Sequence, residues 1–433
     1  MPFGEALRVW LKIGCIGFGG PAGQIALMHR ILVDEKKWID EPRYLHALNF
    51  CMLLPGPEAQ KLATYAGWLL HGTRGGLAAG ILFVAPGALV MLAMSLLYVL
   101  GRGIPVVDGA LFGIKAAVLV IVVEALIRIG RRSLRTRLLL ALAGLAFIGI
   151  FFLDLAFPLI VVAAAVTGYV VARSAPGALG LKAGAEAAAV PMPGRWQHAA
   201  TAAAIGLVLW WAPVAAAAIA LGSAHVFVDI GIFFSKLAVV SFGGAYALLA
   251  YMAQEAVETY RWMSAPEMVD GLGLAETLPG PLIKVTQFVG FLGAYRDAAP
   301  FSPVAAGVIG SALTTWVTFV PPMLLIIAGA PFIEQLRSNQ RLSGALAAIT
   351  AAVVGVILNL TVWFVLHVLF ARVEEVHAGP LRWYAFDPAT LDLKASALAL
   401  LAAVLAFRVH RGLVELVLVM AALGIAVRMI LGA

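Results

Sequence analysis

Residues 54–61 read Leu-Pro-Gly-Pro-Glu-Ala-Gln-Lys and lie in the middle of an otherwise apolar segment, residues 43–70. Proline has no backbone N–H group and glycine weakens a helix, so the tripeptide Pro55-Gly56-Pro57 must interrupt any helix here. In a lipid bilayer each unpaired backbone group costs several kcal/mol. A break inside an apolar segment therefore predicts backbone that lines a cavity or a ligand.

The same break occurs a second time in the chain. A shift of 224 residues places Pro55-Gly56-Pro57 on Pro279-Gly280-Pro281, and Phe18-Gly19-Gly20 on Phe242-Gly243-Gly244. Between residues 12 and 57, 14 of 46 positions are identical under this shift. The chain therefore consists of two related halves. We expect a first transporter repeat in residues 1–173, a linker in residues 174–196 and a second repeat in residues 197–433.

The composition excludes a soluble globular protein. Of the 433 residues, 62% are apolar and 12% are charged, against roughly 25% charged residues in soluble domains. At roughly 20 residues per crossing, the apolar residues suffice for on the order of ten spans. Only helices or closed barrels can span a bilayer, and the long apolar runs lack the alternation of barrel strands. We predict an all-α, polytopic membrane protein.

The charged residues and cysteines indicate neither a cofactor nor a catalytic centre. The formal net charge of +7 fits the excess of basic residues in cytoplasmic loops better than binding to nucleic acid. Cys15 and Cys51 form no Cys-x-x-Cys motif, and no two histidines are spaced four residues apart. We therefore expect no disulfide, metal or other cofactor. Because no constellation of catalytic residues is recognisable, we do not expect an enzyme.

The basic residues also predict the orientation of the spans. Five arginines between Arg128 and Arg137 place one short loop in the cytoplasm. Counting spans outward from this loop places Arg102 outside, and Arg337 with Arg341 inside. The loop near residue 102 and its counterpart near residue 337 thus lie on opposite sides of the membrane. The halves form an inverted repeat with broken helices, an architecture typical of secondary transporters.

Five lysines lie within or beside the apolar segments, where a lysine is a functional candidate. Lys61 and Lys284 follow the two Pro-Gly-Pro breaks within about one helical turn, where the positive end of a helix dipole disfavours a cation unless an anion binds. Alternatively, both lysines snorkel to an interface. The candidate substrate site comprises, besides the two Pro-Gly-Pro tripeptides, Lys12, Gly19, Gly20, Pro21, Gln24, Lys61, Lys115, Lys236, Gly243, Gly244, Lys284 and Gln287.

Two carboxylates beside the breaks could carry protons. Glu58 follows the first break and Glu276 precedes the second. Either could titrate during transport or simply pair with a nearby lysine. Gln24 and Gln287 likewise could bond an oxyanion or satisfy loop amides.

These motifs resemble those of the chromate ion transporter family in its long, two-domain form. The resemblance rests on Phe18-Gly-Gly-Pro21, residues 54–65, Ser241-Phe-Gly-Gly244, and Glu276-Thr-Leu-Pro-Gly-Pro-Leu-Ile283 with Gln287-Phe-Val-Gly290. It implies export of chromate from the bacterial cytoplasm across the inner membrane, which gives chromate resistance, with sulfate as a chemical analogue. The second half carries Ala245 in place of Pro21 and Leu282 in place of Glu58. We therefore expect the halves to contribute unequally to the site.

Three functions stay open at this point: a chromate exporter, a transporter or exchanger of sulfate or another divalent oxyanion, and a membrane enzyme or scaffold. The expected partners are chromate, sulfate and the lipid bilayer. Nucleic acid is not an expected partner, and a homodimer is left open.

The inverted topology predicts a labelling pattern. Cysteines introduced at Arg102 and at Ser338 should react with a membrane-impermeant reagent from opposite sides of the membrane, because the two loops are repeat counterparts in oppositely oriented halves. Labelling from the same side would mean that the halves are parallel.

Overall fold

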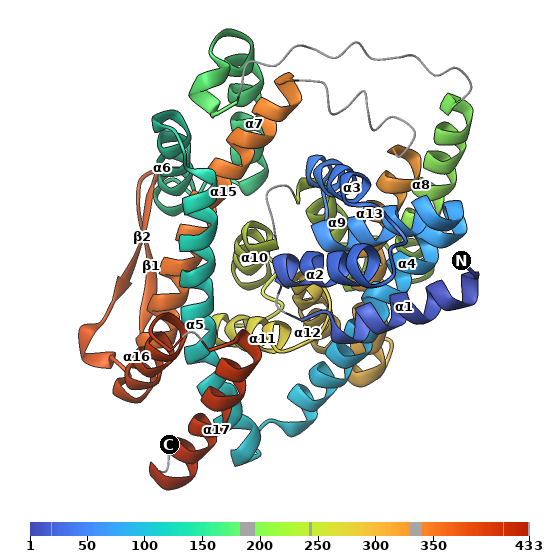
Figure 1. Cartoon of the computed structure of the whole chain (residues 1–433). Helices are drawn as coiled ribbons and strands as arrows, with labels where there is room; N and C mark the ends of the chain where they lie inside the picture. The colour runs from blue at the N-terminus through green and yellow to red at the C-terminus, as the bar shows by residue number, and fades with distance from the viewer. Residues whose placement is uncertain (19, 182–194, 242–244, 330–339, 410, 432–433) are drawn as a thin grey trace. The chain divides into compact units, whose positions relative to one another are not determined.

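The computed structural model describes residues 1–18, 20–181, 195–241, 245–329, 340–409 and 411–431, and most of them are helical. Seven helices in this part of the chain are long and apolar enough to cross a membrane (Figure 1). They are α4 (Glu58–Gly101), α5 (Pro105–Ser133), α7 (Phe157–Ser174), α8 (Arg195–Leu221), α13 (Pro303–Gly329), α15 (Gln340–Leu369) and α17 (Leu413–Leu431). The helical, multi-pass membrane fold predicted from the composition is confirmed.

Both Pro-Gly-Pro tripeptides separate helices, as predicted. In the first half α3 (Glu41–Leu53) ends before the tripeptide and α4 begins directly after it. In the second half α11 (Ala265–Glu276) ends before the tripeptide, and a 3-10 turn, η4 (Leu282–Lys284), leads into α12 (Val285–Arg296). Asp40 caps α3 by accepting a hydrogen bond from the N–H of Arg43 at 2.8 Å. This carboxylate therefore pairs one of the N–H donors that a helix start leaves unpaired.

The Phe-Gly-Gly turns are also flanked by helices in the same order in both halves. They are α1 (Phe3–Ile16) and α2 (Gly20–His29) in the first half, and α9 (Val226–Val240) and α10 (Ala245–Gln254) in the second. A π-helical turn follows each second member, η1 (Arg30–Glu35) and η3 (Glu255–Thr259). Because π turns are rare, their recurrence at matching positions supports the common origin of the halves.

The long helix α4 consists of two helical parts. His71 has φ −141° and Gly72 has φ +60° and ψ −152°, values that no α-helix contains. The first part therefore ends near residue 70, where the predicted broken segment also ends. Two shorter apolar helices, α6 (Arg137–Phe152) and α16 (Leu393–Phe407), occupy the positions of further predicted spans.

Contacts divide the chain into two compact units. The first unit contains Met1–Ser95, Glu186–Ala245 and Leu278–Asn339, and the second contains Leu96–Ala185, Tyr246–Thr277 and Gln340–Ala433. Each unit thus combines segments of both sequence repeats. The repeat boundaries stay a prediction about ancestry, since they need not coincide with compact units.

Small residues bring the helices of the second unit close together. The helices α5 and α17 pack against each other, and a Cβ atom on Gly424 would lie 2.3 Å from the carbonyl oxygen of Gly109. In the same unit α7 packs on α15, where a Cβ atom on Gly168 would lie 2.3 Å from the carbonyl oxygen of Gly344. Such small-residue contacts are the usual way in which membrane helices associate without a hydrophobic driving force.

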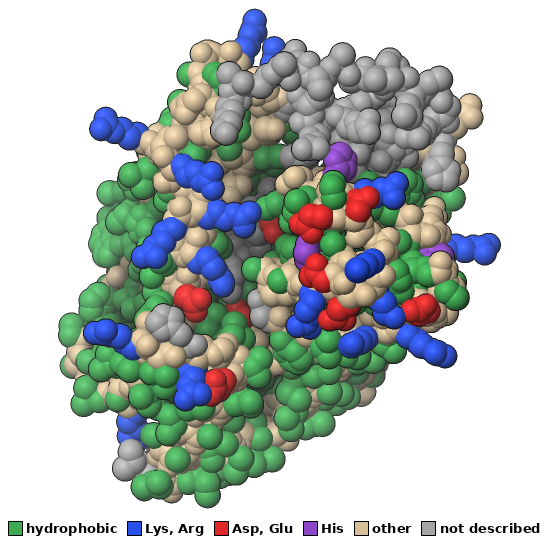
Figure 2. Space-filling model, in the orientation of Figure 1, with side chains coloured by type: hydrophobic (Ala, Val, Ile, Leu, Met, Phe, Trp, Pro, Cys, Tyr) green, Lys and Arg blue, Asp and Glu red, His purple; other side chains and the backbone are tan. Residues whose placement is uncertain are grey.

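Apolar side chains cover much of the face shown in Figure 2. On α4 of the first unit, Ile81 is 52% exposed and Leu89 is 69% exposed. Charged side chains gather over the turn between α2 and α3 of the same unit (Figure 2), where Lys36 pairs with Glu5 at 2.7 Å. Exposed apolar surface of this extent is what a lipid-facing helix presents.

A β-hairpin in the second unit was not predicted. Strands β1 (Val373–Ala378) and β2 (Leu381–Phe386) pair antiparallel, with Val373 opposite Phe386. Gly379 in the connecting turn has φ +59°, a value that suits glycine. A 3-10 turn, η6 (Pro388–Thr390), leads from the hairpin toward α16.

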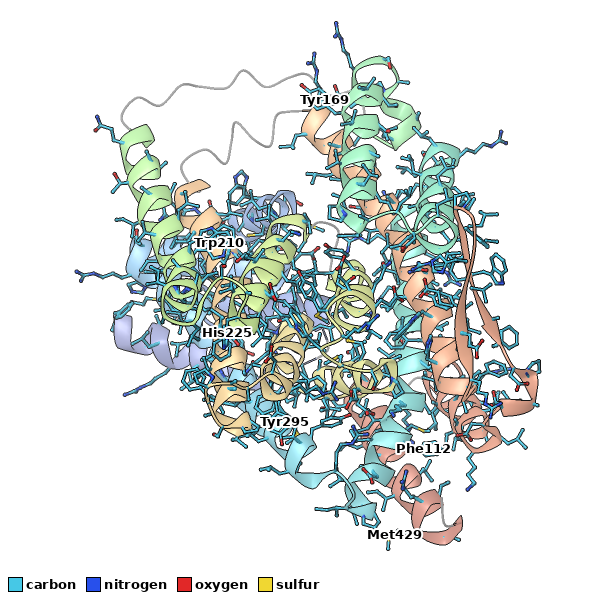
Figure 3. The ribbon with its side chains drawn as sticks, turned by 180° about the vertical axis from the view of Figure 1, so that it is seen from behind. Phe112, Tyr169, Trp210, His225, Tyr295 and Met429 are labelled. Carbon is cyan, nitrogen blue, oxygen red and sulfur yellow. The ribbon has the colours of Figure 1, made fainter. Side chains whose placement is uncertain are left out.

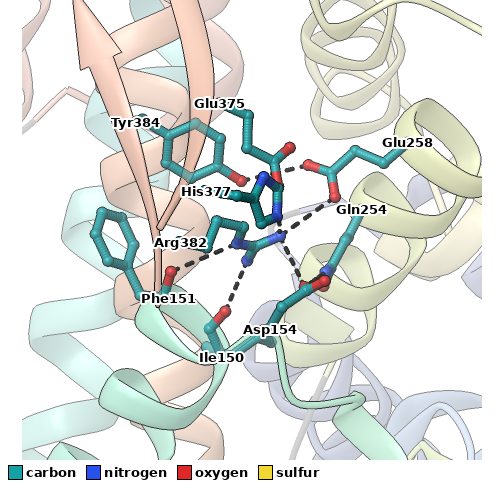
Figure 4. A network of polar contacts seen from close by, with 9 residues as sticks. All are labelled: Ile150, Phe151, Asp154, Gln254, Glu258, Glu375, His377, Arg382 and Tyr384. Carbon is teal, nitrogen blue, oxygen red and sulfur yellow. Dashed lines mark hydrogen bonds and ion pairs between the residues drawn. The ribbon is translucent and has the colours of Figure 1, made fainter. Parts of the chain in front are cut away.

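One arginine anchors this hairpin to the helices of its unit (Figure 4). The side chain of Arg382 is 1% exposed and lies 2.8 Å from Asp154, 3.4 Å from Glu258 and 3.5 Å from Glu375. It also donates a hydrogen bond to the carbonyl oxygen of Ile150 at 2.7 Å. Three carboxylates thus face a single guanidinium group, an arrangement that favours protonation of one of them.

The carboxylate that takes this proton should be Glu258, which lies outside the seven long apolar helices. Burial and, second, the Glu375 carboxylate raise the pKa of Glu258 from 4.5 to about 7. Because the folded protein then holds the proton more tightly than the unfolded chain, this stabilisation is complete below about pH 4.5 and is lost as the pH rises through about 7. We expect the melting temperature to fall between about pH 5 and pH 8, and Glu258→Gln to flatten this slope.

The matched control is Glu374→Gln, an exposed position on β1 beside Glu375. This variant should leave the pH dependence of the melting temperature unchanged. A slope that persists in full in Glu258→Gln would contradict the assignment.

Candidate functional site

The two Pro-Gly-Pro breaks are held by reciprocal backbone hydrogen bonds in the first unit. The N–H of Gly280 donates to the carbonyl oxygen of Gly17 at 2.8 Å, and the N–H of Gly56 donates to the carbonyl oxygen of Ser241 at 3.0 Å. Under the 224-residue shift Gly17 corresponds to Ser241 and Gly56 to Gly280. Each break therefore pairs with the residue that precedes the Phe-Gly-Gly sequence of the other repeat. Such reciprocal contacts are produced by a pseudo-twofold axis.

Glycine is required at the centre of both breaks. Gly56 has φ +106° and Gly280 has φ +91°, a region that side-chain-bearing residues rarely adopt. A Cβ atom on Gly56 would also lie 2.5 Å from Cγ of Pro322 on α13. Backbone conformation restricts both positions, and close packing restricts Gly56 as well.

The lysines after the breaks turn back toward them. Lys61, 1% exposed, donates from Nζ to the carbonyl oxygen of Leu54, and Lys284, 0% exposed, donates from Nζ to the carbonyl oxygen of Pro279. Leu54 is the C-cap of α3, where a cation is favoured by the helix dipole. Both ammonium groups thus lie at the breaks.

The start of α4 offers further donors beside Lys61. Pro57 is the N-cap of this helix, since its carbonyl oxygen accepts from the N–H of Lys61 at 3.0 Å. The N–H groups before Lys61, including that of Glu58, have no carbonyl partner within their own helix. An ammonium group and the positive end of a helix dipole therefore lie together, which suits a small anion.

Three buried glutamines surround the breaks in the same unit. Gln24 donates to the carbonyl oxygens of Gly280 at 2.6 Å and Gly17 at 3.2 Å, and so joins the two repeats. Gln60 and Gln287 donate to further backbone carbonyls at 2.9 Å. The Oε1 atoms of all three accept no hydrogen bond within the described residues. These acceptors can bind water or a proton carried by an anion.

The two breaks differ in accessibility. Residues 279–281 are buried, whereas Pro55, Pro57 and Glu58 are only partly buried. Gly20 and Pro21, at the start of α2, are also partly buried. A ligand can thus reach the first break more easily than the second, in line with the unequal contributions expected from the sequence.

The remaining predicted site residues are distributed more widely. Lys12 on α1 and Lys236 on α9 are exposed. Lys115 and Glu276 belong to the second unit, where Lys115 pairs with a buried aspartate, Asp270, at 3.2 Å. Their roles stay predictions. Gly19, Gly243 and Gly244 lie outside the described residues.

Asp270 is a site candidate that the sequence reasoning missed. Its side chain is 2% exposed on α11 and accepts a hydrogen bond from the hydroxyl of Tyr98 at 2.9 Å. The signal that singled out the lysines applies equally here, since Asp270 interrupts the apolar run from Met268 to Ala275. Carboxylates were considered only beside the breaks, which left Asp270 out.

A multi-pass helical fold with two related halves, whose broken helices hold buried cations, defines a membrane transport protein. The profile of the chromate transporter family matches residues 4–169 and 228–427, one match in each half. The chain therefore belongs to the chromate transporter family.

Individual relatives agree with this assignment. The chain is 34% identical to the chromate transport protein of Pseudomonas aeruginosa over 365 residues, which cover 82% of this chain and 80% of that protein. It is 28% identical to the probable chromate transport protein of Synechococcus elongatus over 82% of each chain. An uncharacterized transporter of Methanocaldococcus jannaschii is 25% identical over 82% of this chain and 83% of its own length. No solved structure matches the chain.

A glycine of α4 provides a test of the packing around the second break. A Cβ atom on Gly87 would lie 2.2 Å from the carbonyl oxygen of Pro279 and 2.8 Å from Nζ of Lys284. Although Gly→Ala inside a helix normally stabilises by roughly 0.5–1 kcal/mol, we expect Gly87→Ala to destabilise the protein by roughly 1–3 kcal/mol through overpacking. The melting temperature of the protein and the anion flux of the reconstituted protein should both decrease.

Gly144→Ala is the matched control, because this helical glycine of α6 has no atom within 4 Å of the added Cβ. Equal behaviour of the two variants would refute the close packing at the second break.

Proposed function

We propose that this protein exports chromate across the cell membrane and thereby confers chromate resistance, and that it binds the anion at the paired breaks of the first unit. The observation that carries the proposal is the pair of reciprocal hydrogen bonds, Gly280 to Gly17 and Gly56 to Ser241, which joins two interrupted helices next to buried lysines. Membership of the chromate transporter family supports chromate as the anion, as do the names of its relatives.

The chemistry of the first break suits a tetrahedral divalent oxyanion. An ammonium group has three N–H donors, so Lys61 can bind an anion while it donates to Leu54. The backbone N–H groups at the start of α4 add directional donors and the positive end of a helix dipole. Four oxygens at the corners of a tetrahedron can accept from both kinds of donor at once.

The direction of transport follows from the charge of the substrate. Moving one elementary charge through a membrane potential of 100 mV is worth about 2.3 kcal/mol. A dianion that leaves an inside-negative cell therefore gains about 4.6 kcal/mol per 100 mV, whereas uptake must overcome the same amount. Export needs little further coupling, and Glu58 or Glu276 would titrate if protons are exchanged.

Sulfate transport or exchange is the second candidate function. Chromate and sulfate share charge and tetrahedral shape, and a site made of N–H donors recognises both properties. Competition between the two anions is therefore part of the test.

The experiment is chromate flux into inverted membrane vesicles with an imposed interior-positive potential. The potential should drive accumulation of labelled chromate without added sodium, because the field acts directly on the dianion. Lys61→Gln should lose most of this flux, while Lys37→Gln, an exposed position, should keep it.

A strict requirement for sodium, or flux that ignores the potential, would contradict the electrogenic export. Stronger flux of sulfate than of chromate under the same potential would favour the second candidate. Full activity in correctly inserted Lys61→Gln would overturn the assignment of the anion site.

A further inference from the structure

The second unit contains a polar cavity of its own. It measures about 180 Å³ and is lined by Arg102, Asp108, Lys115, Asp270 and Arg428, together with Phe112. Figure 3 labels Phe112 on α5 and Met429 on α17, the two packed helices that supply most of this lining.

This cavity adjoins a larger one near the start of α16. The larger cavity measures about 450 Å³, shares Phe112 and Arg428 with the first, and adds Asp392 and Lys394. The loop at Arg102, the start of α16 and the end of α17 all belong to the side that the basic loops predict to be external. Together the cavities form an approach from that side to Lys115 and Asp270.

Close helix packing brings the buried pair together. A Cβ atom on Gly273 of α11 would lie 2.3 Å from Cγ2 of Ile114 on α5, so only glycine permits this approach. One residue further along α5, Nζ of Lys115 lies 3.2 Å from Oδ1 of Asp270. The hydroxyl of Tyr98 donates to Oδ2 at 2.9 Å. Oδ1 accepts no hydrogen bond from the described residues, so its contact with Lys115 is an ion pair alone.

Three cations around the cavity each face one carboxylate, at unequal distances. Arg102 lies 2.8 Å from Glu267 and 3.2 Å from the hydroxyl of Tyr98. Lys115 lies 3.2 Å from Asp270, and Arg428 lies 3.8 Å from Asp108. Lys115 and Arg428 hold their carboxylates less closely than Arg102 does, so an entering anion can compete for both.

The other helices near Asp270 bring no charge to it. Helix α15 packs on α11 and has no titratable side chain between Arg341 and His367. Helix α17 carries only Glu415 besides Arg428. The ionisation of Asp270 is therefore governed by Lys115, Tyr98, Arg102, Glu267 and the pair of Asp108 with Arg428.

An anion bound to Lys115 would leave Asp270 as a buried carboxylate without its cation. Such a charge is costly, and a buried carboxylate in this position takes up a proton instead. The side chain of Asp108 is 22% exposed and can be solvated by water, whereas that of Asp270 is 2% exposed. The proton goes to Oδ1, since Oδ2 already accepts from Tyr98.

We propose that this cavity is a second binding site for a tetrahedral divalent oxyanion, at which Lys115 and Arg428 bind the anion and Asp270 takes up one proton as it loses its contact with Lys115. The proposal rests on the proposed function for the class of anion. The counterpart of Asp270 under the 224-residue shift is His46. Around Lys115 the shift is 235 residues, which places Gly109-Ala110-Leu111 on Gly344-Ala345-Leu346 and Lys115 on Thr350. The fold shared by the two repeats therefore does not require the charged pair. The charged pair thus occurs in one half only, and we assign it a functional role.

The test measures proton uptake during sulfate binding to the purified full chain in lipid nanodiscs. Sulfate is the probe because it stays a dianion near neutral pH and releases or takes up no proton itself. A pH indicator in weakly buffered solution should report uptake of about one proton for each sulfate bound at this site, because one carboxylate, Asp270, becomes protonated when the anion binds. Asp270→Asn should bind sulfate at least as tightly and abolish this uptake.

Two further variants test the cations. Arg428→Gln should weaken sulfate binding about tenfold or more, as expected for loss of a charge-assisted hydrogen bond. The double variant Lys115→Gln/Asp270→Asn removes the pair together, so no charge is left buried alone, and it should lose both binding and uptake at this site. Glu124→Gln is the control, since Glu124 is exposed and pairs with Arg128 at 3.8 Å.

The second site would be overturned if Asp270→Asn took up as many protons as the wild-type protein. It would also be overturned if both cation variants kept the wild-type affinity for sulfate, or if the wild-type protein did not bind sulfate. Wild-type vesicles separate this inference from the proposed function. If wild-type vesicles transport no chromate while the proton uptake that depends on Asp270 persists in nanodiscs, the proposed function fails and the second site stands.

Discussion

A backbone amide inside a bilayer must find a partner, and the first unit is organised around this requirement. Each Pro-Gly-Pro break exposes amides that its own helices cannot pair. The carbonyl oxygens of Gly17 and Ser241 each accept a hydrogen bond from the break of the other repeat. Because the bonds are reciprocal, neither break can be closed by its own half of the sequence. At this bond Gly56 has a positive φ and lies close to Pro322.

Side chains complete what the backbone begins. Gln24 binds carbonyls on both sides of the junction, at Gly17 and Gly280. Lys61 and Lys284 donate hydrogen bonds from their ammonium groups to backbone carbonyl oxygens at the breaks. The polar groups that stabilise the junction are thus the same groups that can meet an anion, so structural and functional roles overlap at this site.

Much of this organisation was predictable, because it is encoded locally. Proline and glycine fixed where helices end, apolar runs fixed the spans, and the repeated order of motifs fixed the two halves. The partners of the breaks were not predictable, since Gly17 and Gly280 are separated by most of the chain and no periodicity links them. The hairpin at residues 373–386 was missed because it is short and lies between two spans. Asp270 was missed because carboxylates were expected only beside the Pro-Gly-Pro breaks.

The reciprocity of the junction also bears on how such a chain could have arisen. A half-length ancestor carrying one Pro-Gly-Pro break and one Phe-Gly-Gly turn would have a donor and an acceptor that cannot meet within one copy. In a pair of copies, the donor at each break can bond to the acceptor of the other copy. Gene duplication and fusion would then preserve a former subunit interface as an internal contact. Released from identity, the halves could diverge, so that Glu58 now stands opposite Leu282 and Asp270 opposite His46.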